Sequence, residues 1–288
     1  MRWNTKSARL AVLLTALLWS SGGLAVKITD CPPIPLTGLR CFFTLVLFFA
    51  LFRKELSFRF NKAQWAGAIA YCSMAVCYTV ATKWTTAANA ILLQYTAPIF
   101  VALLSSWLLK EKLNKADWLV VLVIMGGMVL FFFDKTDAGG MWGNLIAIGS
   151  GISYAFFIIF TRMEKDGSPV GTIVLGNIIG LIICLPFFGD ITFSLNTLAG
   201  GMYFGMVYGG LAYILYSMAI KYVSALTAIL IATIEPILNP VWVFLAIGET
   251  PSMYAVAGGY VVVATLLIKN IYDLKKGSGD NQSGSEIQ

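Results

Sequence analysis

Histidine is absent from this sequence, and charged side chains are scarce. Without histidine the chain cannot build a Ser–His protease, an HExxH zinc site or most histidine-based metal centres. The sequence also contains no GxxxxGK(S/T) loop for nucleotide phosphates, no GxGD motif and no pair of aspartates within its apolar stretches. We therefore expect a protein that is not an enzyme and has no catalytic residues, no cofactor and no bound metal.

The shortage of charge also determines the class of protein. Charged residues make up 12% of the chain and hydrophobic residues 58%. Such a composition excludes a water-soluble fold, because charge is too sparse to cover the apolar surface that remains after folding. Charge-free stretches long enough to cover about 30 Å of hydrocarbon, or nearly so, recur along the chain. They cover residues 10–26, 63–82, 84–109, 138–161, 167–189, 191–220 and 250–268, and weaker segments at 41–52, 118–133 and 225–247 bring the predicted transmembrane helices to ten.

The basic residues are distributed unevenly between the predicted connections. If the N-terminus is cytoplasmic, sixteen of the 20 lysines and arginines lie on the cytoplasmic side, whereas only Lys27, Lys83 and Lys135 lie on the other. This asymmetry follows the positive-inside rule. It predicts a multi-pass protein of the cell (cytoplasmic) membrane with both termini in the cytoplasm. Because this topology explains the net charge of +6, we expect no nucleic-acid partner.

An internal repeat relates the two halves of the chain. At an offset of 138 residues, a segment of the first half recurs in the second, and both copies carry a proline and a glutamate spaced thirteen apart: Pro98 with Glu111, and Pro236 with Glu249. Halves of five helices each must have opposite orientations in the membrane, because an odd number of crossings separates equivalent points. We predict an all-α integral membrane fold of ten transmembrane helices in two inverted five-helix repeats, 8–133 and 142–271, followed by a disordered cytoplasmic tail, 272–288.

The prolines of this repeat indicate a binding site in the middle of the membrane. Pro98 and Pro236 lie near the centres of their spans, and each lacks the N–H that an upstream carbonyl would normally accept, that of Gln94 in the first case. Paired interruptions of corresponding helices typically mark a central site in carriers. A kink that serves packing alone is the alternative interpretation.

Glu235 is the one carboxylate predicted at mid-span. An ionised carboxylate there costs roughly 2.5–3.5 kcal/mol on insertion scales, so we expect its side chain to face the bundle interior. Asn239 follows one helical turn later on the same face. Glu235 is either a proton-coupling or cation-binding group, or a carboxyl that hydrogen-bonds across helices for structural reasons.

Arg40 and several aromatic residues complete the candidate site. Arg40 near the outer start of its span either extends to the membrane interface, binds a substrate carboxylate or pairs with Glu235. Trp19 and Tyr154 are equivalent in the two halves, and an aromatic wall beside an acid suits an organic cation. The candidate substrate-binding residues are Trp19, Ser20, Arg40, Gln94, Tyr95, Pro98, Tyr154, Glu235, Pro236 and Asn239.

Glycines at four-residue spacing mark faces for close helix contact. Gly201, Gly205 and Gly209 form one such face, and Gly176 with Gly180 forms another. Faces of this kind serve contacts within a bundle or between two copies of a chain. The sequence therefore leaves a monomer and a homodimer equally open.

Three sets of motifs resemble the EamA family of the drug/metabolite transporter superfamily: LLWSS at 17–21, APIFVALL at 97–104 with WLLKE at 107–111, and IEPI at 234–237 with GE at 248–249. The resemblance covers about residues 9–269. It implies ten helices in two five-helix repeats and a carrier, often an exporter, of amino acids or other small polar metabolites, with its site in a central cavity. Lys110 departs from the family pattern, which usually has glycine before this glutamate.

These observations predict a secondary transporter, or permease, that moves a small metabolite by alternating access. Glu235 would select charge or couple transport to an ion. The substrate would be an organic cation or amine, or an amino acid-like metabolite held at its carboxylate by Arg40. The expected partners are this small molecule and the lipid bilayer. A membrane-embedded structural or channel protein without carrier activity is the alternative.

Overall fold

The structure, a computed structural model, describes residues 5–52, 56, 58–108, 115–130, 133, 138–163, 168–219, 222, 231 and 234–283. Every regular element within these ranges is a helix, as the composition predicts. The first half contains α1 (Thr5–Ser20), α2 (Gly22–Ile28), α3 (Pro33–Phe52), α4 (Lys62–Trp84), α5 (Ala87–Gln94), α6 (Ala97–Leu108) and α7 (Lys115–Leu130). The second contains α8 (Ala138–Met163), α9 (Pro169–Cys184), η1 (Leu185–Asp190), α10 (Leu195–Met202), η2 (Tyr203–Leu211), α11 (Ala212–Ala219), α13 (Ile234–Ile247) and α14 (Met253–Ser283).

Length and composition divide the described helical segments into two groups. Six are long and apolar enough to cross a membrane: Lys6–Ile28, Pro33–Phe52, Lys62–Trp84, Gly140–Thr161, Pro169–Asp190 and Leu195–Ala219. Four shorter apolar segments, Ala87–Val101, Trp118–Gly127, Ile234–Ile247 and Met253–Lys269, lie where the sequence predicts the remaining spans. The chain is therefore a multi-pass membrane protein built from helices.

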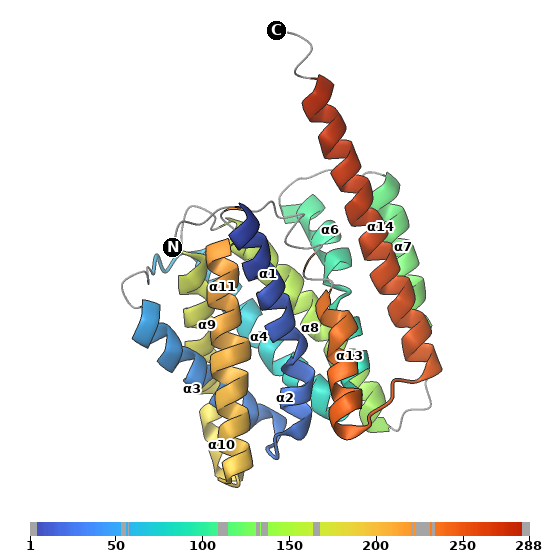
Figure 1. Cartoon of the computed structure of the whole chain (residues 1–288). Helices are drawn as coiled ribbons and strands as arrows, with labels where there is room; N and C mark the ends of the chain where they lie inside the picture. The colour runs from blue at the N-terminus through green and yellow to red at the C-terminus, as the bar shows by residue number, and fades with distance from the viewer. Residues whose placement is uncertain are drawn as a thin grey trace.

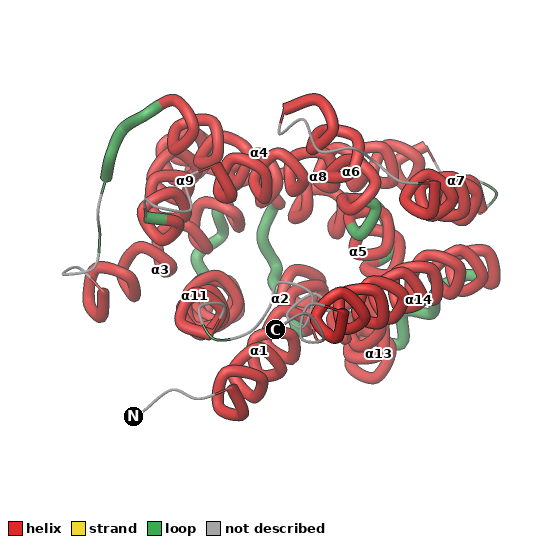
Figure 2. Tube along the Cα trace, turned by 90° about the horizontal axis from the view of Figure 1, so that it is seen from above, coloured by secondary structure: helices red, strands yellow, loops and turns green. Residues whose placement is uncertain are grey.

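The helices pack in pairs that correspond between the two halves. α3 packs on α9 and α7 on α14, and each pair joins helices at equivalent positions of the two repeats. The contact of α4 with α8 likewise corresponds to the contact of α11 with α1. Seen from above, α9, α4, α8 and α6 lie along one side of the bundle, and α11, α1, α13 and α14 lie along the other (Figure 2). The packing thus has the pseudo-two-fold form that the internal repeat predicts.

The direction of the chain also differs between the halves. Figure 1 shows α1 beginning and α14 ending toward the same, upper end of the bundle. Thr85, directly after α4, binds Lys27 at the end of α2 and Asn144 near the beginning of α8, so the first long span of one half ends where that of the other half begins. Such antiparallel placement is what an inverted repeat requires.

The glycine faces serve contacts within the chain. A Cβ atom added to Gly205 would lie 2.5 Å from Cβ of Phe43 and 2.7 Å from the carbonyl oxygen of Arg40, both on α3. A Cβ on Gly176 would lie 2.8 Å from the carbonyl oxygen of Ala68 on α4. These glycines let η2 and α9 approach their neighbours at backbone distance, so contact within the bundle accounts for them.

Irregular backbone interrupts several spans within the described residues. The first is divided at Ser21, between α1 and α2, and the fourth at Tyr95 and Thr96, between α5 and α6. The predicted interruption before Pro98 is thereby confirmed. The eighth span widens into a π-helix, η2, and the hydroxyl of Thr44 on α3 donates a 2.8 Å hydrogen bond to the carbonyl of Gly205 within it. Such irregular backbone is tolerated in lipid only where protein surrounds it.

The C-terminal segment differs from the composition-based expectation. A disordered tail is predicted over residues 272–288, whereas α14 continues through this stretch as far as Ser283. Figure 1 shows these last turns projecting beyond the other helices. The helix is propagated from the apolar turns that precede it, because adding a residue to an existing helix costs far less than nucleating a new one.

Close packing of η2 on α3 gives a testable prediction. Gly205→Ala forces backbone atoms apart, because the added methyl group meets Phe43 and a main-chain oxygen. We expect the free energy of unfolding to fall by about 1–3 kcal/mol, measured on the protein in detergent. Gly149→Ala on α8, where the new methyl group meets nothing within 4 Å, is the matched control and should leave stability unchanged or slightly increased. Equal losses in both variants would contradict this account.

Candidate functional site

Glu235 lies inside the bundle and is held by a residue of the other half. It belongs to the first turn of α13, where the helix dipole favours a carboxylate, and its exposed fraction is 6%. The hydroxyl of Tyr95, in the break between α5 and α6, donates a 2.7 Å hydrogen bond to Oε2 of Glu235. The predicted inward orientation is therefore observed. The hydrogen bond from Tyr95 accounts for how the carboxyl is held. The functional role of Glu235 stays a prediction.

A small cavity of about 20 Å³ opens beside this pair. Its volume corresponds to roughly one or two water positions. The lining residues come from the first, third, fourth, sixth, eighth and ninth predicted spans, and thus from both repeats. They are Trp19, Met74, Gln94, Tyr95, Tyr154, Tyr208, Tyr213 and Glu235. A polar, strongly aromatic site containing one acid thus lies between the halves.

A second cavity of about 10 Å³ adjoins the first and contains Arg40. The two cavities share Met74, Gln94, Tyr208 and Tyr213 as lining residues. Arg40, Ala75, Tyr78 and Phe204 line the second cavity alone. A buried cation and a buried acid therefore occupy neighbouring compartments of one central region.

The Arg40 side chain does not reach the membrane interface. Its exposed fraction is 2%, and its Nη1 lies 3.4 Å from the hydroxyl of Tyr71. The guanidinium carbon also lies 5.6 Å from the ring centre of Tyr71 and 5.8 Å from that of Phe204. Among the described residues the one salt bridge is Lys27–Glu249, so Arg40 and Glu235 are not paired. Burial thus argues against an extension to the membrane interface, the pairing with Glu235 is not observed, and the binding of a substrate carboxylate stays a prediction.

The remaining predicted residues lie around the cavities. Ser20 accepts a 2.9 Å hydrogen bond from Nε1 of Trp242, and Asn239 donates a 3.2 Å bond to the hydroxyl of Tyr78. Pro236 is buried beside Glu235 in the first turn of α13. The backbone of Pro98 is part of α6, but its side chain lies outside the described residues. Trp19, Gln94, Tyr95, Tyr154 and Glu235 thus share one cavity, whereas Ser20, Pro236 and Asn239 do not line it.

Sequence reasoning misses part of the cavity wall. Met74 is an apolar residue in an apolar span, so nothing in the sequence distinguishes it. Tyr208 and Tyr213 are two of many aromatic residues in the spans, and their common orientation depends on the π-helix η2, which has no sequence signal here.

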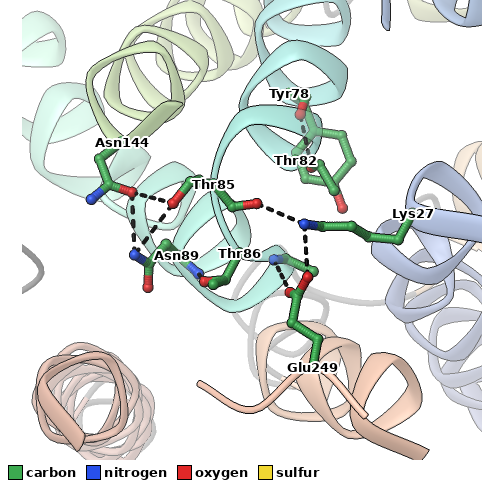
Figure 3. A network of polar contacts seen from close by, with 9 residues as sticks. Lys27, Tyr78, Thr82, Thr85, Thr86, Asn89, Asn144 and Glu249 are labelled. Atoms are coloured by element: carbon green, nitrogen blue, oxygen red, sulfur yellow. Dashed lines mark hydrogen bonds and ion pairs between the residues drawn. The ribbon is translucent and has the colours of Figure 1, made fainter. Parts of the chain in front are cut away.

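A polar network joins the two repeats at one end of the bundle (Figure 3). Nζ of Lys27 lies 2.7 Å from Oε2 of Glu249 and donates a 2.8 Å hydrogen bond to the carbonyl of Thr85. The other oxygen of Glu249 accepts a 2.7 Å bond from the N–H of Ala87, in the first turn of α5. The hydroxyl of Thr85 donates to Asn144 of α8 at 2.8 Å. Both repeats contribute to this network, so separating them at this end would break it.

Comparison with known proteins identifies relatives of similar length. The sequence profile of the EamA-like transporter family matches residues 6–133 and again 141–271. An "uncharacterized transporter" of Archaeoglobus fulgidus is 24% identical over 285 residues, covering 91% of this chain and 96% of the relative. The "uncharacterized transporter YwfM" of Bacillus subtilis is 23% identical, covering 90% of this chain and 92% of the relative.

A solved structure supports the fold. One crystal structure of a protein superposes on this chain with a TM-score of 0.66 and 20% sequence identity, covering 93% of this chain and 97% of the other. At this identity the likeness concerns the course of the backbone alone.

The hydrogen bond between Tyr95 and Glu235 gives a testable prediction. Tyr95→Phe removes the donor and leaves a buried carboxyl without this partner. We expect the free energy of unfolding in detergent to fall by about 1–3 kcal/mol. Tyr260→Phe on α14 makes the same change at a side chain that is 76% exposed, and it should have no measurable effect. A Tyr95 variant as stable as the wild type would show that the bond contributes nothing to stability.

Proposed function

The chain belongs to the EamA-like transporter family, and from this membership we propose that it is a secondary transporter with its substrate site at the paired central cavities. The observation that carries the proposal is Glu235: a buried carboxyl between the two repeats, next to a cavity lined by both. A carboxyl in the hydrocarbon region is costly, and such groups typically serve substrate or ion pathways.

The proposed topology has ten spans, the six long helical segments together with the four shorter ones. The end of the bundle where α1 begins and α14 ends would be cytoplasmic, because the sequence places most basic residues there. The network of Lys27, Thr85, Ala87 and Glu249 would then lie on the outer side. The opposite course of the two repeats supports this arrangement as an inverted pair.

Transport would proceed by alternating access. In inverted-repeat carriers, one set of helices rocks against the other around a fixed central site. The outer network ties α2 of the first repeat to the segment that follows α13 in the second, and the central cavities are only water-sized. This arrangement corresponds to a conformation closed on the outer side.

The cavity walls favour a substrate with a positively charged group. Glu235 supplies a negative charge, and Trp19, Tyr154, Tyr208 and Tyr213 supply ring faces that attract cations in a desolvated site. An amine would satisfy both. Glu235 would select the charge of the substrate or, by exchanging a proton, couple its movement to the proton gradient.

The role of Glu235 is tested by transport in proteoliposomes. The wild-type protein should give saturable uptake of at least one compound from a panel of labelled amines and amino acids, and Glu235→Gln should abolish it, because a neutral amide cannot balance a cation. Asp190→Asn makes the same change on an exposed carboxylate at the end of η1 and should transport normally. Unchanged uptake by Glu235→Gln would remove the proposed role, and no saturable uptake by the wild type would remove the carrier.

Closure of the outer end is tested with a native cysteine. Cys31 is 5% exposed in the turn between α2 and α3, and burial raises the pKa of its thiol. The neighbouring carbonyl of Thr29 is bound at 2.6 Å by Nζ of Lys83. Glu249→Gln should weaken the outer network and expose Cys31, so a membrane-impermeant maleimide added from outside should label it several-fold faster. The labelled peptide is identified by mass spectrometry.

A carboxylate outside the network provides the control for this experiment. Asp190→Asn makes the same kind of change at an exposed carboxylate at the end of η1, and labelling of Cys31 should stay at the wild-type rate. If Glu249→Gln left the labelling rate unchanged, the network would not hold the outer end closed.

A further inference from the structure

Arg40 is a buried cation whose described partners are all neutral. Its guanidinium contacts the hydroxyl of Tyr71, the sulfur of Cys41 at 3.8 Å and two aromatic rings, and its Nε has no hydrogen-bond partner. No carboxylate among the described residues lies within salt-bridge distance. An ion in a membrane interior without a counter-charge is costly, and such residues usually serve a function.

Glu235 is a buried acid that lines the adjoining cavity, and the two cavities share several lining residues. Its described hydrogen-bond partner is the neutral hydroxyl of Tyr95. Two opposite buried charges would gain considerable energy by pairing in a low dielectric, yet the fold keeps them in adjoining cavities. A ligand that carries both charges would neutralise Arg40 and Glu235 at once, and neither an amine alone nor an acid alone can do so.

Gln94 lies at the boundary between the two cavities and lines both. Its Nε2 donates a 2.7 Å hydrogen bond to the hydroxyl of Ser150 on α8, which donates in turn to the carbonyl of Met74 at 3.0 Å. With its nitrogen engaged, Gln94 has its amide oxygen left to accept an N–H from a ligand. The same wall contains Met74, whose flexible side chain can move to widen the water-sized cavities.

We propose that the two cavities are the two ends of one site for a zwitterion: Arg40 binds the carboxylate of the substrate, and Glu235 with Gln94 binds its ammonium group. The inference rests on the proposed carrier function for the identity of the site, and it adds the anionic subsite and the orientation of the ligand. The carboxylate points toward α3 and the amine toward α13.

The test uses matched ligands on the purified full-length protein in detergent, with thermal stabilisation as the readout. The panel contains amino acids whose amine is α, β, γ or ε to the carboxylate, and each is compared with the amine lacking the carboxylate and with the acid lacking the amine. We expect at least one amino acid to stabilise the protein at a lower concentration than either of its matched compounds. Sodium chloride is included to detect simple occupation of Arg40 by an inorganic anion.

Variants assign the effect to Arg40. Arg40→Gln should weaken binding of that amino acid by about tenfold or more, the size expected for a lost charge-assisted hydrogen bond, while binding of the matched amine stays unchanged. Arg40→Lys keeps the charge but not the fork geometry and should bind with intermediate affinity. Arg9→Gln removes an exposed arginine from α1 and should bind as the wild type does.

Several outcomes would overturn the proposal. An amine that binds as tightly as its amino acid would show that the carboxylate is not recognised, and so would a panel in which no amino acid binds. Stabilisation by chloride alone would assign Arg40 to an inorganic anion. Equal weakening of amine and amino acid by Arg40→Gln would give Arg40 a structural role. If Arg40→Gln does not fold, the proposal is still tested by the order in which the ligands stabilise the wild-type protein and by the affinity of Arg40→Lys.

The same experiments separate this inference from the carrier function. Saturable transport of an amine with which no amino acid competes would support the carrier function and contradict the zwitterion site. Amino acid binding that depends on Arg40, without transport in proteoliposomes, would support the zwitterion site and contradict the carrier function.

Discussion

The cost of placing polar groups in hydrocarbon governs this structure. Lipid offers no hydrogen bonds, so every charged or irregular element within a span must be enclosed by protein. Arg40, Glu235, the break at Tyr95 and the π-helix η2 all belong to such elements, and all lie in or beside the central region. The site is therefore where the fold can accommodate polarity, and the surrounding helices can be uniformly apolar on their outer faces.

The pseudo-two-fold packing explains how the central region draws on both repeats. α3 with α9 and α7 with α14 bring equivalent helices together at opposite sides of the bundle, and the remaining helices enclose the space between them. Trp19 and Tyr154 then reach one cavity from equivalent spans. At one end of the bundle the two repeats are joined directly, since Glu249 caps α5 and pairs with Lys27 there. The packing of equivalent helices is thus supplemented by polar contacts between the repeats at this end.

The sequence predicts the helical class, the internal repeat and the inward orientation of Glu235, because composition, periodicity and the cost of a buried charge act locally. The break before Pro98 also follows directly from a missing N–H. The environment of Arg40 does not follow, because a long side chain near a span end can extend in several directions, and only the close approach of η2 to α3 decides between them. The partners of Met74 likewise depend on context that a single sequence does not carry. The extension of α14 to Ser283 is missed for another reason, because composition describes the tail alone and not the helix that continues into it. The span count, the orientation in the membrane and the substrate role of the site residues stay predictions.

The π-helix has a consequence for the register of the eighth span. In a regular α-helix, residues five apart point about 140° away from each other, whereas i→i+5 bonding brings them roughly into line. Tyr208 lies within η2 and Tyr213 two residues after its end, in α11, and both line the same cavity. The wider turn also aligns α11 so that Tyr213 and Tyr216 meet Trp19, with ring centres 5.0 and 5.4 Å away. The wider turns of η2 thus set the direction of this aromatic face, and an ordinary α-helix over the same residues would turn Tyr208 and Tyr213 apart without altering any side chain.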